Sequence, residues 1–131
     1  MHILWEKIPQ KDTHFGFYLD GDNIVFRYSG PFDTNTGEWT SVLGHFEPAD
    51  FIRSIRTLER KRECIIKGAR DQTLRLTVLP AGSLALSFVA GYGNNISISD
   101  LETVFADFVS SFDKVPTSAA QKVLANGAYN P

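Results

Sequence analysis

The fold is decided by residues 47–112, which read EPADFIRSIRTLERKRECIIKGARDQTLRLTVLP over positions 47–80 and AGSLALSFVAGYGNNISISDLETVFADFVSSF over positions 81–112. A segment with helical spacing comes first, three short segments with strand-like alternation follow, and a second helical segment closes the stretch. Helices and strands mixed in this way are typical of α+β domains. We therefore predict a mainly antiparallel sheet of about six strands with two amphipathic helices packed on it.

The first helix is predicted to begin at Pro48, because proline fits the first helical turn, where its missing N–H group costs nothing. Glu47 and Asp50 favour the positive end of the helix dipole, and Lys61 and Arg62 suit the opposite end. Apolar residues at helical spacing form one face of this helix: Phe51, Ile52, Ile55 and Leu58. Away from that face, a second stripe consists of Arg53, Arg56 and Arg60.

The second helix is predicted to begin at Ser99, because Glu102 follows three residues later and completes a capping-box pattern. An apolar stripe then continues through Leu101, Val104, Phe105, Phe108, Val109 and Phe112. A stripe this rich in phenylalanine indicates a core-facing surface. We expect this helix to pack on the sheet.

Strands are predicted on both sides of the first helix. Asp20-Gly21-Asp22-Asn23 is a turn that predicts a hairpin, and Gly30-Pro31 is expected to end the strand that follows. The predicted strands are residues 3–8, 15–19, 24–28, 39–46, 64–66, 74–78 and 84–88. We expect one domain over residues 1–115 and a tail over residues 116–131 that is loosely ordered or forms one docking helical turn.

Composition indicates a folded protein of the reducing cytoplasm. The chain has 131 residues, of which 43% are hydrophobic and ten are phenylalanine, so it can bury a core. No run approaches the roughly 20 apolar residues that span a bilayer, and the first residues do not resemble a secretion signal. The one cysteine, Cys64, cannot form an internal disulfide and is expected to be a buried structural thiol.

Charge is unevenly distributed, although the net charge is only −2. Among the charged residues, carboxylates predominate in residues 1–50, whereas arginine and lysine predominate in residues 51–70. Such polarity can steer a charged partner, or it can simply solvate the faces that meet water. Nucleic acid is not the expected partner, because Glu59 and Glu63 dilute the basic segment and no recognition motif is present.

The sequence contains no recognisable catalytic, metal or cofactor motif. His2, His14 and His45 lie in separate segments, although folding could bring His14 and His45 together. Carboxylates such as Asp20 and Asp33 lie in turns, where they are expected for turn chemistry alone. We therefore expect no catalytic residue, no metal and no cofactor, and we interpret the chain as a protein that binds another protein.

The order of elements from Trp39 to Phe112 resembles that of small bacterial immunity proteins, which partner polymorphic or contact-dependent toxins. The resemblance rests on the helix opened by Pro48-Ala49-Asp50-Phe51-Ile52, on the strand meander through residues 74–88, and on the closing helix at residues 101–112. It implies a non-enzymatic inhibitor that binds its cognate toxin in the cytoplasm.

The expected partner-binding residues form an acidic and a basic group. The acidic turn residues would suit a basic partner such as a nuclease toxin, with Trp39 as an anchor residue. The basic group consists of arginines, which are enriched at protein interfaces. The two groups could also pair with each other across a homodimer. Two other functions stay open: a small-molecule binder or enzyme with a cavity between the helix at 101–112 and the sheet, and a structural or oligomeric component of a phage or secretion system. The candidate residues are Asp20, Asp22, Asp33, Glu38, Trp39, Arg53, Arg56 and Arg60.

Overall fold

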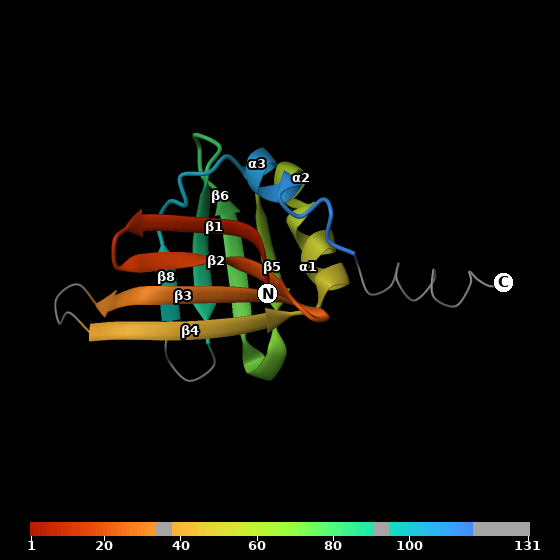
Figure 1. The fold of residues 1–131 in the computed structure, drawn as a ribbon. Helices are drawn as coiled ribbons and strands as arrows, with labels where there is room; N and C mark the ends of the chain where they lie inside the picture. Colours follow the sequence, from red (N-terminus) through yellow and green to blue (C-terminus); the bar gives the residue numbers. More distant parts are fainter. Residues whose placement is uncertain (34–37, 91–94, 117–131) are drawn as a thin grey trace.

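Two four-stranded antiparallel sheets form the body of the protein, and the strands of the first sheet run across those of the second (Figure 1). The computed structural model describes residues 1–33, 38–90 and 95–116. In each sheet, every strand pairs with its neighbour in the chain. Over the described residues, the first sheet contains β1 (His2–Gln10), β2 (Thr13–Asp20), β3 (Asn23–Asp33) and β4 (Glu38–Phe46), and the second contains β5 (Glu63–Lys67), β6 (Thr73–Val78), β7 (Leu84–Val89) and β8 (Asn95–Ile98).

The predicted α+β class with antiparallel strands is confirmed, but the single sheet of about six strands is wrong. The hairpin at residues 20–23 forms as expected, with Gly21 at a φ of 59°. β3 nevertheless continues through Pro31 by pairing with β4, where Trp39 lies opposite Pro31, and only its pairing with β2 ends earlier, at Ser29 opposite His14. Pro31 therefore removes no hydrogen bond from that pair of strands.

The first predicted helix begins where expected but is divided in two. Its helices are α1 (Pro48–Ile55) and α2 (Leu58–Lys61). The Glu47 carboxylate accepts hydrogen bonds from the N–H groups of Ala49 (3.0 Å) and Asp50 (2.9 Å), and so caps α1. The break follows Ile55, where the Thr57 hydroxyl donates to the Ser54 carbonyl over 2.7 Å.

The second predicted helix is shorter than expected, because α3 spans Phe105–Ser110 and does not begin at Ser99. The predicted capping box is therefore wrong. Instead, the Asp100 carboxylate accepts a hydrogen bond from the Glu102 N–H group (2.7 Å), and the Leu101 N–H group donates to the Leu84 carbonyl (2.6 Å). The bond to Leu84 holds this segment beside the start of β7. The helix α3 therefore begins only after the chain has passed that strand.

Phenylalanine side chains fill the space between the two sheets. The ring centroids of Phe26 in β3 and Phe88 in β7 are 5.1 Å apart. Gly44 in β4 allows this approach, since a Cβ atom there would lie 2.5 Å from the Phe88 ring. Sheet-to-sheet packing at this point therefore depends on the absence of a side chain at position 44.

The helices α1 and α3 cover one side of this core (Figure 1). From α3, Phe108 contacts Trp5 and Phe17, with ring centroids 5.3 and 5.6 Å away. Phe112, just after α3, lies 5.1 Å from Phe51 of α1. The interpretation of the apolar stripe as core is confirmed for Phe108 and Phe112, which are 0% and 1% exposed.

The edge of the first sheet is tied to the second sheet by Gln72. Gln72 precedes β6 and follows the short 3₁₀ turn η1 (Ala69–Asp71). Its side-chain amide donates to the Leu43 carbonyl (3.1 Å) and accepts from the His45 N–H group (3.0 Å). Since both groups belong to β4, the buried Gln72 amide acts on that strand as another strand would. We call this contact the Gln72 bridge.

Candidate functional site

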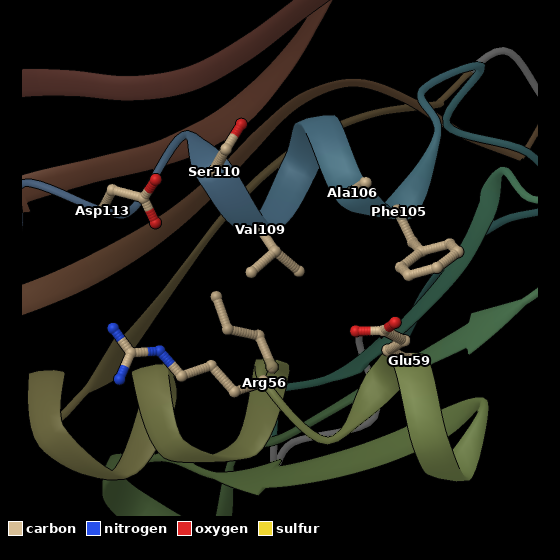
Figure 2. A pocket seen from close by; sticks show the side chains of 8 residues that line it. Arg56, Glu59, Phe105, Ala106, Val109, Ser110 and Asp113 are labelled. Atoms are coloured by element: carbon tan, nitrogen blue, oxygen red, sulfur yellow. The ribbon is translucent and has the colours of Figure 1, made fainter.

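An open groove of about 320 Å³ lies between α1–α2 and α3 (Figure 2). We call it the helix groove. It exists because α3 packs against the core through Phe108 and Phe112 and leaves a neighbouring face turned toward α1 and α2. Its lining residues are Ile55, Arg56, Glu59, Phe105, Ala106, Val109, Ser110 and Asp113.

The floor of the helix groove is apolar. Ile55 is buried at 1% exposure, whereas Val109 and Phe105 are partly buried. Figure 2 shows Val109 and Phe105 pointing from α3 toward α1 and α2. The Arg62 guanidinium carbon lies 5.7 Å from the Phe105 ring centroid, a cation–π distance that favours this ring position. The groove therefore presents an apolar floor with an aromatic ring at one end.

Charged side chains of both signs border this floor. Arg56 comes from the junction of α1 and α2, Glu59 from α2, and Asp113 from the residues after α3. All three are exposed. Figure 2 shows Arg56 at the end of the groove where Asp113 lies, and Glu59 at the end where Phe105 lies. A partner residue that entered the groove would thus contact the apolar floor and have charged groups around it at the border.

The three predicted arginines have different surroundings. Arg56 lines the helix groove. Arg53 forms an ion pair with Asp50 at 3.0 Å, and both side chains are exposed, so the pair contributes little to stability. Arg60 is exposed on α2, beyond the break in the helix. The predicted stripe is therefore divided, and the groove contains one of its members.

The predicted acidic residues do not come together. Asp20 and Asp22 belong to the β2–β3 turn, whereas Asp33 pairs with Glu38 where β3 meets β4. These positions lie at opposite ends of β3, which has 11 residues, so they are separated by roughly 33 Å. Trp39 pairs with Pro31, near the second of these ends. A single partner would have to span the length of the sheet to contact both acidic groups.

His14 and His45 do not come together, and Cys64 is a buried free thiol. His14 in β2 lies opposite Ser29 of β3, and His45 in β4 lies opposite Val25 of the same strand. The two histidines are therefore two strands apart across the sheet and four residues apart along β3, a distance of roughly 16 Å. Burial raises the pKa of the Cys64 thiol to about 12, as expected for a buried structural thiol. Within residues 1–33, 38–90 and 95–116, no group of three or more His, Cys, Asp and Glu side chains is arranged to hold a metal ion, and no helix is long and apolar enough to cross a bilayer.

Sequence reasoning missed most of the helix groove, because it treated the apolar residues from Leu101 to Phe112 as one buried stripe. Phe105 and Val109 of α3 and Asp113 after it follow one another at a spacing of four, and this narrower pattern marks a face separate from the buried one. The pair Phe108 and Phe112 marks the buried face. Comparisons with protein-family models, curated proteins and solved structures give no match to this chain.

Proposed function

We propose that the protein is a non-enzymatic protein-binding module, and that it acts in the cytoplasm as an immunity protein that neutralises a cognate bacterial toxin. The observation that carries the proposal is the helix groove. Its apolar floor and its border of Arg56, Glu59 and Asp113 have the composition of a protein–protein contact, in which an apolar centre is surrounded by polar and charged residues.

The filling of the core supports a protein partner over a small ligand. The space between α3 and the first sheet is occupied by Phe108 and Phe112, and both side chains are almost fully buried. The helix groove lies on the other side of α3, is open to solvent, and at about 320 Å³ is at the small end of ligand pockets. A groove of this kind suits one apolar side chain from the surface of a partner better than a whole enclosed ligand.

The element order supports a toxin as that partner. The structure keeps the order on which the resemblance to small immunity proteins rests: α1 and α2, then the β5–β8 meander, then α3. Arg56 lines the groove and is exposed, so a partner seated there would also reach a cationic side chain. We propose that the toxin inserts an apolar residue beside Val109 and places polar groups near Arg56.

The test is binding to the toxin domain encoded beside this protein in its native genome, measured by isothermal titration calorimetry on the full chain. Val109→Asp places a carboxylate on the groove floor and is expected to weaken binding by roughly 100-fold or more. Val89→Asp is the matched control, because Val89 is 38% exposed on β7, outside the groove. Binding that Val109→Asp leaves unchanged would remove the groove from the proposal, and no binding by the parent protein would overturn the function.

A further inference from the structure

Among residues 1–33, 38–90 and 95–116, no strand pairs with the outer edge of β5 in the second sheet. The Val78 N–H group donates to the Arg62 carbonyl over 2.8 Å, and the register places Glu63 opposite Thr77. Because hydrogen-bonded and non-hydrogen-bonded pairs alternate along an antiparallel ladder, the N–H and C=O groups of Glu63, Ile65 and Lys67 point away from β6. In the part of the chain that the structure describes, no backbone or side-chain hydrogen bond reaches these groups.

This edge differs from the edge of the first sheet at β4. There the Gln72 bridge occupies the groups of Leu43 and His45. A trough of about 360 Å³ lies beside β5, and it is lined by Glu63, Cys64 and Ile65 of the strand and by Arg53, Ser54, Thr57 and Lys61 from the segment that forms α1 and α2. The open space therefore lies along the same strand whose outward backbone groups have no partner within the described chain.

The exposed side chains of β5 read Glu63, Ile65 and Lys67 and carry opposite charges at their two ends. This pattern is complementary to itself when the strand is turned around. In an antiparallel pair centred on Ile65, Glu63 lies opposite Lys67 of the second copy and Ile65 lies opposite Ile65. Ile65, which is 46% exposed, would then be covered by an identical side chain.

We propose that two copies of this chain pair through their β5 strands, edge to edge and antiparallel. The β5–β8 sheets of the two copies then join into one continuous sheet across a two-fold axis at Ile65. Each of the three outward-facing residues donates one bond and accepts one, which gives about six backbone hydrogen bonds between the copies. A strand of five residues buries less than the ~1,200 Å² of a standard interface, so the dimer is weak and depends on concentration. This inference is independent of the proposed toxin binding, which uses the helix groove.

The experiment is sedimentation equilibrium of the full chain up to about 1 mM, a concentration at which weak association is measurable. Glu63→Lys or Lys67→Glu alone places like charges opposite each other twice in the symmetric dimer, and each is expected to weaken dimerisation roughly tenfold. The double variant Glu63→Lys/Lys67→Glu restores opposite charges at both positions and is expected to recover the dimer. Thermal unfolding of each variant serves as a control, because Glu63 also lies 3.7 Å from Arg75 within the monomer.

A second pair of variants tests the centre of the contact. Ile65→Lys is expected to abolish the dimer, whereas Leu43→Lys is the matched control, since Leu43 has the same 46% exposure but lies on the edge closed by the Gln72 bridge. A chain that stays monomeric at every concentration overturns the proposal. A dimer that the single charge variants and Ile65→Lys leave unchanged overturns it as well.

Discussion

Replacing Gly44 with alanine tests how closely the two sheets are packed. The new Cβ atom would lie 2.5 and 2.7 Å from two carbons of the Phe88 ring and 3.2 Å from the Phe46 ring, all closer than the 3.4 Å at which ordinary contact begins. Phe88 and Phe46 are 0% and 1% exposed, so neither ring can turn into solvent. The sheets must therefore move apart or the rings must leave their preferred rotamers.

The expected cost follows from two opposing effects. Overpacking a core typically costs about 1–3 kcal/mol, whereas replacing glycine by alanine gains about 0.4–1 kcal/mol through the unfolded chain. We expect Gly44→Ala to lower the free energy of unfolding by about 1–2 kcal/mol. Urea unfolding followed by circular dichroism measures this change, and the unfolding temperature should fall by about 3–8 °C.

A double-mutant cycle with Phe88→Leu isolates the contact. The smaller side chain removes the ring that the added Cβ atom would meet, so Gly44→Ala is expected to cost at least about 0.5 kcal/mol less in the Phe88→Leu background than in the parent. The reasoning is refuted if Gly44→Ala changes stability by less than about 0.5 kcal/mol or if the two substitutions are additive.

Two further substitutions test the Gln72 bridge and the buried thiol. Gln72→Leu leaves the Leu43 carbonyl and the His45 N–H group without their partner and is expected to lower the free energy of unfolding by about 1–3 kcal/mol; Gln72→Glu keeps only the acceptor and should also be destabilising, and an unchanged urea midpoint in Gln72→Leu would contradict the bridge. Burial raises the pKa of Cys64 from 9.0 to about 12, so above pH 9 the unfolded chain loses the thiol proton first and stability falls as pH rises, by up to about 1.4 kcal/mol per pH unit until pH 12. Cys64→Val should show a shallower loss of stability between pH 9 and about pH 11, and identical pH profiles for the two proteins would show that the thiol does not contribute.

Local chemistry predicted the elements better than it predicted their assembly. The turn at Gly21 and the start of α1 at Pro48 depend on residues within one turn of the chain, and both form as expected. The division into two sheets depends instead on which apolar faces meet. Phe26 and Phe88 are far apart in sequence but 5.1 Å apart in space, and no local pattern specifies that contact.

The same limit explains the error at the second helix. Ser99 and Glu102 have the residue types of a capping box, but Leu101 forms a hydrogen bond with Leu84 of β7, and this long-range bond displaces the helix start. The helix groove was missed for a related reason. Whether Val109 is buried with Phe108 or left facing α1 and α2 depends on where those helices lie, which the spacing of the residues does not show.

The pairing of every strand with its neighbour in the chain also bears on how the protein folds. Each sheet can assemble from hairpins, which need only short loops to close and form quickly. The slower event is then the meeting of the two aromatic faces, since their contacts join the two halves of the chain across the α1–α2 connection. Gly44 and Phe88 lie in that contact, so their substitutions should slow refolding to the extent that the sheets have already met in the transition state.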